Sequence, residues 1–246
     1  MIAVLSPAKT LDYESPLPAL APTTPRFAAE ATTLAAAASH LTQKKLSALM
    51  HISPALAKLN AARFRDFPDA PERPAMFAFD GDVYTGLDAY TLAEEGVAFA
   101  QGHLRLLSGL YGLLRPLDLM RPYRLEMGTR WAPRRKALTD WWGDRIADLL
   151  AQDVAEEGTG VVLNLASQEY WAAVGGRLPT GVRVVAVDFR DGERFVSFHA
   201  KKARGMMARW MIEHRVTDID AMRGFDSAGY AFDAEASSDD LWRFVR

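Results

Sequence analysis

The sequence predicts a mixed α/β fold, a single body in which helices flank a central sheet. Short apolar runs typical of buried strands occupy Ile2–Leu5, Val161–Leu165 and Val182–Phe189. Between them lie segments of helical character, alanine-rich over Phe27–Leu41 and amphipathic over Asp140–Glu156. No repeat and no linker interrupts the 246 residues, so we expect one domain over residues 1–246.

The remaining elements follow from local composition. The proline-rich segment Asp12–Pro25 predicts a loop on the surface. Ser53–Pro54 divides Thr42–Phe67 into two short helices, because serine before proline marks a helix start. We further expect, in chain order, a strand fragment at Ala75–Phe79, a glycine-punctuated loop at Gly81–Gly86, a helix at Thr91–Leu107, a strand at Arg194–Phe198 and a helix at Lys201–Arg215.

Composition excludes several classes of protein. With 49% hydrophobic and 24% charged residues the chain is globular, and 29 Lys and Arg against 31 Asp and Glu give a net charge of −2, without a general basic coat. The absence of cysteine excludes disulfides, thiolate metal sites and thiol catalysis. The five histidines show no metal-ligand spacing, and no dinucleotide fingerprint or Walker motif is present, so no metal and no cofactor is expected. Since no signal peptide or apolar span is visible, we expect a cytoplasmic protein with no membrane partner.

Charge is distributed unevenly along the chain. Three runs are rich in cations and poor in acids, namely Thr42–Arg65, Arg121–Lys136 and Lys201–Arg215. Acidic residues concentrate in Asp140–Glu157 and Asp218–Asp240. A chain segregated in this way can present a positive cleft on a neutral body, although each run can equally be a solvated helix face.

Polar side chains follow three of the expected strands. Ligands of open α/β sheets bind beyond the carboxyl ends of strands, so these residues predict a pocket for a small anionic ligand. Its candidate residues are Ser6, Lys9, Thr10, Asn164, Ser167, Glu169, Tyr170, His199, Lys201, Lys202 and Arg204. The alternative, that Asn164 and Ser167 only cap a helix, remains open.

The segment Arg121–Gly128 follows neither a helical nor a strand period. It places Arg121, Arg124 and Glu126 within six residues, and guanidinium forks suit phosphate or carboxylate. An Arg–Glu ion pair that braces a loop is the alternative.

The stretch Leu46–Ala57 has the layout of a helix-hairpin-helix, embedded in residues 42–67. Backbone N–H groups of such a hairpin hold a DNA phosphate, with nearby cations assisting. Ile52 fills the apolar position of the hairpin, whereas His51 and Ser53 stand where glycines usually occur, so a plain helical hairpin is the alternative. The candidate DNA-binding residues are Lys44, Lys45, His51, Ser53, Lys58 and Arg63.

Several strings along the chain resemble the YaaA peroxide stress protein family, a UPF0246-type family. They are Leu5–Asp12, Gly81–Leu87, Leu107–Met120, Arg121–Gly128, Asn164–Ser167, Lys201–Gly205, Gly224–Phe225 and Gly229–Tyr230. The resemblance implies a single α/β body with a helix-hairpin-helix and a positive cleft, which binds double-stranded DNA without established catalysis. It also implies a part in surviving hydrogen peroxide by limiting free intracellular iron and oxidative DNA damage. The chain departs from the family at Asp80, where a lysine is usual.

The sequence therefore supports two functions of different classes. The first is a stress-response protein that binds the DNA backbone with little sequence preference, and which we do not expect to be an enzyme. The second is an enzyme acting on a phosphorylated or nucleobase-containing small molecule at the strand ends. In this second reading Lys9, Arg121, Arg124 and Lys202 hold the anion, and a proton is handled by Asp82, Glu126 or Glu169.

Overall fold

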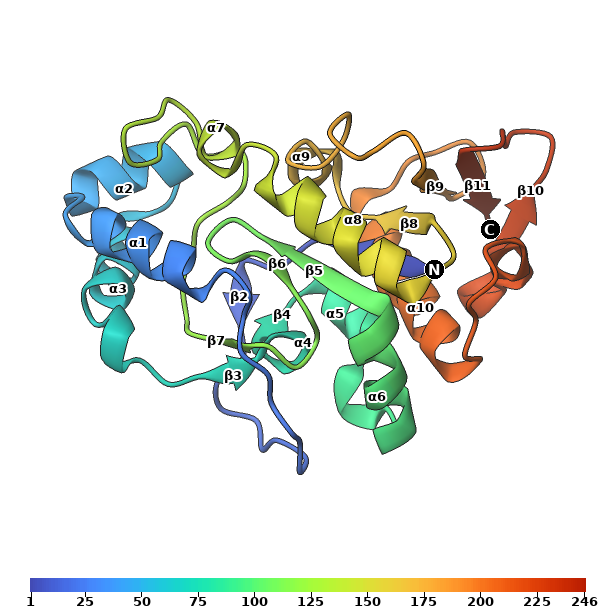
Figure 1. Ribbon diagram of the computed structural model, residues 1–246, viewed down its shortest axis with the longest axis horizontal. Coiled ribbons are helices and arrows are strands. Elements are labelled where there is room, and N and C mark those ends of the chain that lie inside the picture. Colours follow the sequence, from blue (N-terminus) through green and yellow to red (C-terminus); the bar gives the residue numbers. More distant parts are fainter.

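The computed structural model describes residues 1–246 and confirms a mixed α/β domain around a seven-stranded sheet (Figure 1). The order across the sheet is β10-β11-β9-β8-β1-β5-β6. The strands of this sheet are β1 Ile2–Leu5, β5 Leu104–Ser108, β6 Gly112–Leu114, β8 Val161–Leu165, β9 Arg183–Arg190, β10 Ala231–Asp233 and β11 Leu241–Val245. Two small ribbons pair β2 Thr10–Leu11 with β4 Phe79–Asp80, and β3 Arg73–Pro74 with β7 Leu119–Met120.

Helices cover both faces of the sheet and one end of the molecule. In Figure 1, α8 passes in front of the strands and α10 behind them, while α1, α2 and α3 gather at the end opposite β10 and β11. The α-helices are α1 Ala28–Ser39, α2 Gln43–Met50, α3 Pro54–Arg65, α4 Ala75–Ala78, α5 Asp82–Leu87, α6 Glu94–His103, α7 Leu138–Trp142, α8 Arg145–Glu157, α9 Gln168–Trp171 and α10 Ser197–Glu213. Four 3-10 turns occupy Phe67–Asp69, Ala89–Thr91, Asp220–Gly224 and Ser227–Gly229. None of the helices is both long and apolar enough to cross a membrane.

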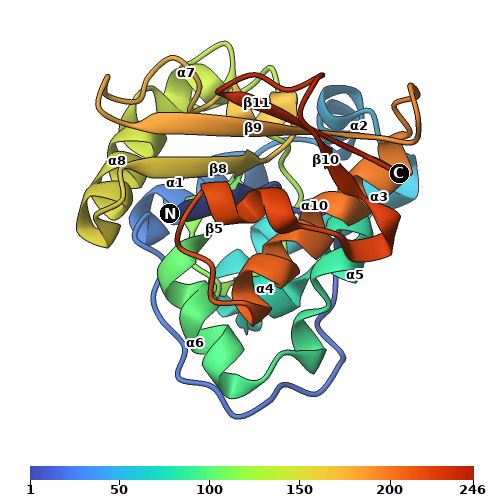
Figure 2. The same ribbon diagram turned by 90° about the vertical axis from the view of Figure 1, so that its right-hand side faces the viewer.

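The interior strand β1 has fully buried residues and pairs in parallel with β5 on one side and β8 on the other. The pairs β8–β9 and β9–β11 are also parallel, and Figure 2 shows β8 and β9 side by side. The carboxyl ends of five strands therefore share one edge. After β1 the chain builds β5 and β6 on one flank, and β8, β9 and β11 on the other, so the switch point of the topology lies between β1 and β8.

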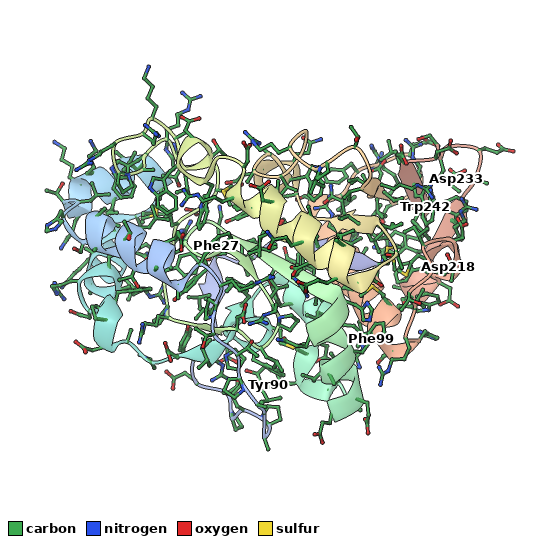
Figure 3. All side chains as sticks on the ribbon, viewed as in Figure 1. Phe27, Tyr90, Phe99, Asp218, Asp233 and Trp242 are labelled. Carbon is green, nitrogen blue, oxygen red and sulfur yellow. The ribbon has the colours of Figure 1, made fainter.

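A pair of aromatic side chains packs at each end of the domain. Phe27, labelled in Figure 3 at the start of α1, packs on Trp142 with ring centroids 5.2 Å apart. At the opposite end Trp242, also labelled, lies 5.6 Å from Phe232. Both tryptophans are fully buried, so they hold α7 and the β10–β11 pair against the hydrophobic core.

Two predictions in the segment 75–87 were wrong. Ala75–Ala78 forms the helical turn α4 rather than a strand, and strand pairing covers only Phe79 and Asp80. The expected loop at Gly81–Gly86 is mostly the helix α5. All four residues of α4 are buried, and an apolar run buried on every side carries no periodicity that separates helix from strand.

Two further boundaries differ from the sequence prediction. The helix expected over Thr91–Leu107 ends at His103, and Leu104 begins the buried strand β5. The strand expected at Arg194–Phe198 is absent, because Arg194 forms only an isolated bridge with Asp191 and α10 starts at Ser197. The alternation of this segment reflects exposed aromatic side chains rather than one face of a strand.

Two glycines allow α5 and α10 to cross in backbone contact. A Cβ atom on Gly86 would lie 2.1 Å from the carbonyl oxygen of Lys202, and one on Gly205 would lie 1.8 Å from that of Val83. Only hydrogen fits at either position. This crossing fixes where the first turns of α10, with their cations, lie relative to the carboxyl edge of the sheet.

A buried ionic network joins the N-terminal segment, β5 and α8. Asp153 accepts hydrogen bonds from Arg105 Nε at 2.6 Å and from Arg26 Nη2 at 2.9 Å, and its side chain is 3% exposed. Burial alone would raise the pKa of Asp153, but the two guanidinium groups outweigh it and hold that pKa below its ordinary value.

Replacing Gly205 by alanine is expected to destabilise the fold by about 3 kcal/mol or more, because overpacking forces α5 and α10 apart. Thermal and urea denaturation measure the loss. The matched control is Gly102→Ala in α6, where a Cβ meets nothing within 4 Å and alanine is expected to stabilise by about 0.5–1 kcal/mol. Equal effects of the two substitutions would contradict the close crossing.

Asp153→Asn is expected to cost about 3–5 kcal/mol at neutral pH, because it leaves two guanidinium groups without their carboxylate. The folded pKa of Asp153 is depressed, so its contribution is complete above the unfolded pKa of about 3.9 and is lost as pH falls through the folded value. The stability gap between wild type and variant should therefore narrow below about pH 4 in urea titrations. A gap that stays constant with pH would contradict this role.

Candidate functional site

The loops after β1 and β8 meet at the switch point of the sheet. The Ser167 N–H donates to Ser6 Oγ at 2.8 Å, and Ser6 Oγ lies 3.2 Å from Ser167 Oγ. Asn164 Oδ1 accepts from the Ala166 N–H at 3.0 Å and so braces the turn out of β8. Ser167 stands at the N-cap position of α9, but its side chain makes no capping hydrogen bond. The structure thus brings the first two of the expected strand ends together.

A cavity of about 740 Å³ opens beside this junction. Its walls come from separate parts of the chain: Lys9 after β1, Ala48–His51 at the end of α2, the segment Arg124–Arg130, and Glu169 in α9. In Figure 1 the segment that leads to α7 passes beside α2. We call this cavity the cleft.

Three cations, Lys9, Arg124 and Arg130, line the cleft against two carboxylates, Glu126 and Glu169. Arg124 Nε donates to Glu126 Oε1 at 3.0 Å, and Lys9 Nζ lies 3.8 Å from the same oxygen. Arg63, half-buried on α3, is close enough to Arg124 to be repelled by it. Burial and this repulsion lower the pKa of Arg63, although Tyr13 opposes them. The ion pair expected within Arg121–Gly128 is therefore present, but it involves Arg124 and leaves a positive surplus.

The connection between α2 and α3 is three residues long. His51 takes a left-handed conformation with φ of 51°, a position that favours glycine, and its N–H bonds to the Ser47 carbonyl. Ser53 Oγ accepts from the Leu56 N–H at 3.3 Å and caps α3. Ile52 and Ala57 are buried, as the hairpin layout predicts.

Exposed cations surround the cleft. We call basic rim the exposed Lys and Arg residues of α2, of α3 and of the segment before α7 that have no carboxylate within 4.0 Å, namely Lys44, Lys45, Lys58, Arg130, Arg134, Arg135 and Lys136. They come from two of the three acid-poor runs, which folding brings to one end of the molecule.

Other predicted residues lie outside the cleft. Arg121 pairs with Glu72 at 3.1 Å and lies over the Phe67 ring, so it anchors a loop. Asp82 stands in the first turn of α5, 3.8 Å from Lys201, and Lys202 is exposed on α10. The residues that would hold an anion and move a proton in the enzyme hypothesis are thus divided among the cleft, the loop of Arg121, α5 and α10.

Two further predicted positions serve local structure. Thr10 and Asp80 face each other in the β2–β4 ribbon. His199 contacts Asp191 rather than the cleft, and it lies in α10 instead of following a strand.

A second cavity, of about 660 Å³, adjoins the cleft, and Glu169 lines both. It contains the predicted residues Asn164, Ser167, Lys201 and Arg204. The sequence prediction missed its remaining polar and aromatic residues, namely Gln168, Trp171, Asp188, Arg190, Phe195 and Ser197. The strand-end rule could have found Asp188 and Arg190, since they end β9. In neither cavity, nor elsewhere, do three His, Cys, Asp or Glu residues group as a metal site.

Known proteins resemble this chain along its whole length. A family model described as "Peroxide stress protein YaaA" matches residues 1–236. A UPF0246 protein of Rhizorhabdus wittichii is 59% identical over 100% of this chain and 99% of its own length. UPF0246 proteins of Idiomarina loihiensis and Paracidovorax citrulli are 48% and 51% identical, each over 100% of this chain and 98% of their own length.

Glu126→Gln is expected to destabilise the protein by about 1–3 kcal/mol, because Arg124 loses its only carboxylate while it remains mostly buried. Glu169→Gln is the matched control, since Glu169 is exposed and glutamine keeps the oxygen that accepts from the Gly128 N–H. Urea denaturation at neutral pH measures both. A loss at position 169 equal to that at 126 would contradict the proposed pairing.

Proposed function

Because the chain belongs to the peroxide stress protein YaaA family, we propose that it binds the backbone of double-stranded DNA with little sequence preference under peroxide stress. One observation carries the proposal. Two acid-poor runs that are distant in sequence meet at the cleft, and the basic rim they form has no carboxylate partners. Cations left unpaired in this way are available to phosphates.

Side chains rather than hairpin amides carry most of the proposed contact. The N–H groups of His51 and Ile52 bond to Ser47, that of Leu56 bonds to Ser53, and Pro54 has none. Few backbone donors are left for a phosphate at the start of α3. We therefore expect Lys44, Lys45 and Arg130 to dominate binding, with Lys9 and Arg124 deeper in the cleft. Contacts of this kind position a duplex without reading its bases.

We extend the proposal to the role that family resemblance implies, namely limiting free intracellular iron and oxidative DNA damage. The chain has no cysteine, and no group of its carboxylates and histidines is arranged to hold iron. We therefore propose that the protein protects DNA from oxidative damage by binding to it, and not by chelating iron with its own side chains.

DNA binding is expected to weaken by about 100-fold between roughly 50 and 200 mM salt, as some four phosphate contacts would require. Fluorescence anisotropy with a short mixed-sequence duplex measures this, and a second duplex of unrelated sequence should give a dissociation constant within about threefold.

The double variant Lys44→Glu/Lys45→Glu should abolish this binding. The charge-matched control is Arg183→Glu/Arg223→Glu, whose exposed side chains lie at the β9–β11 end, far from α2 (Figure 1). Thermal melting verifies that each variant is folded. Binding that survives reversal at 44 and 45, or that fails equally in the control, would contradict the proposal.

A further inference from the structure

The cavity of about 660 Å³ has no part in the proposed DNA contact. It opens beyond the carboxyl ends of β8 and β9, beside the first turns of α10. Its size falls within the range of small-molecule sites, about 300–1,000 Å³. We call it the nucleotide cavity, for reasons that follow from its charge and its walls.

Arg204 supplies a partly buried cation without an ion-pair partner. Its Nε is buried and makes no hydrogen bond, and no carboxylate lies within 4.0 Å of its guanidinium. Burial lowers the pKa of Arg204, although Asp188 acts in the opposite direction. A buried guanidinium N–H without a hydrogen-bond partner costs free energy, and an anion bound to the same group would offset part of that cost.

The acids of the nucleotide cavity are already engaged. Asp188 accepts from Arg190 Nε at 2.7 Å and lies 3.5 Å from Arg243 Nε. Glu169 accepts from the Gly128 N–H at 3.2 Å. Lys201 lies one turn before Arg204 on α10, and its nearest carboxylate, that of Asp82, is 3.8 Å away. Three cations, Arg190, Lys201 and Arg204, line the cavity against two acids, Glu169 and Asp188, so the cavity keeps a net positive charge.

The same cavity has aromatic and apolar walls. Trp171 and Phe195 line it, Phe195 is 53% exposed, and the Arg190 guanidinium lies 5.7 Å from the centroid of the Phe195 ring. Leu241, at the start of β11, is 49% exposed. An exposed Phe195 ring and a partly buried Trp171 ring beside cations suit a ligand that joins a flat ring to an anion, since bases stack on aromatic side chains and on guanidinium planes.

We propose that this cavity binds a nucleoside 5′-phosphate, with the phosphate on Arg204 and Lys201 and the base against Trp171 and Phe195. The site does not depend on the DNA-binding proposal, because it shares only Glu169 with the cleft and none of the basic rim. It differs also from the enzyme reading of the sequence, which placed the anion on Lys9, Arg121, Arg124 and Lys202.

Isothermal titration of the full-length protein with adenosine 5′-monophosphate tests the proposal, with adenosine and inorganic phosphate as partial ligands. We expect the nucleotide to bind at least about tenfold more tightly than either part, because each contact contributes separately. Phe195→Ala should weaken nucleotide binding by about fivefold or more, and Lys201→Gln by about tenfold, the usual cost of a charged hydrogen bond. Arg204→Gln should abolish it.

The control residue for Lys201 is its neighbour Lys202, and the control residue for Phe195 is Phe198, three positions further along the chain. Phe198 is 57% exposed but does not line the cavity, and Lys202 is exposed next to Lys201. Phe198→Ala and Lys202→Gln should bind nucleotide as the wild type does. Because Phe195 and Lys201 are exposed, their variants remain informative if Arg204→Gln does not fold.

Three results would overturn the proposal. The first is that inorganic phosphate binds as tightly as the nucleotide, and the second is that Phe195→Ala and Lys201→Gln bind the nucleotide as tightly as the wild type does. The third is that the wild-type protein does not bind the nucleotide at about 1 mM. Loss of nucleotide binding in Lys44→Glu/Lys45→Glu would also overturn it, by placing the ligand in the cleft. Failure of DNA binding in that double variant with nucleotide binding retained would support it.

Discussion

The carboxyl end of β1 is the point on which the rest of the structure depends. This strand is fully buried and pairs in parallel on both sides, so the loops that follow β1 and β8 must emerge next to each other. The Ser167 N–H and the Ser6 hydroxyl then join the two loops directly. Both cavities open around this junction, one toward α2 and the other toward α10, and Glu169 stands between them. The positions of both cavities are therefore a consequence of where the strand order of the sheet reverses.

Charge segregation matters more in this molecule than its net charge of −2. The basic rim lies at the end formed by α2, α3 and the segment before α7, whereas the acidic stretch Asp218–Asp240 lies at the end formed by β10 (Figure 1). A dipolar arrangement attracts a polyanion to one end of a protein and repels it from the other, so under the proposed function it would orient a duplex before contact. Inside the cleft, Glu126 pairs with the mostly buried Arg124 and lies 3.8 Å from Lys9, so the cations without a carboxylate partner are the exposed side chains of the basic rim.

Local pattern was sufficient for elements with a clear period or a clear boundary. The strands β1, β8 and β9 and the helices α1, α2 and α3 were predicted close to their observed limits. The single helix predicted over Asp140–Glu156 is divided at Gly143 into α7 and α8. Local pattern failed for α4 and β5, which are wholly buried, because burial on every side removes the periodicity that separates a helix from a strand. It also failed at Arg194–Phe198, where exposed aromatic residues produce the alternating pattern of a strand. The meeting of Lys9, Arg124 and His51 depends on topology, which no local pattern contains. Arg204 was named among the strand-end residues, but its burial in a helix without an ion-pair partner is visible only in the folded chain.

Cross-linking from single cysteines tests most directly where a duplex binds. The chain has no cysteine of its own, so each introduced thiol reports one position without background. Lys45→Cys and Arg130→Cys place a photoreactive label on the basic rim, while Arg183→Cys and Arg223→Cys place it at the far end of the sheet. We expect labels at 45 and 130 to cross-link to duplex DNA at low salt, and labels at 183 and 223 to give only background. Equal cross-linking from both ends, or stronger cross-linking from the β9–β11 end, would contradict binding in the cleft.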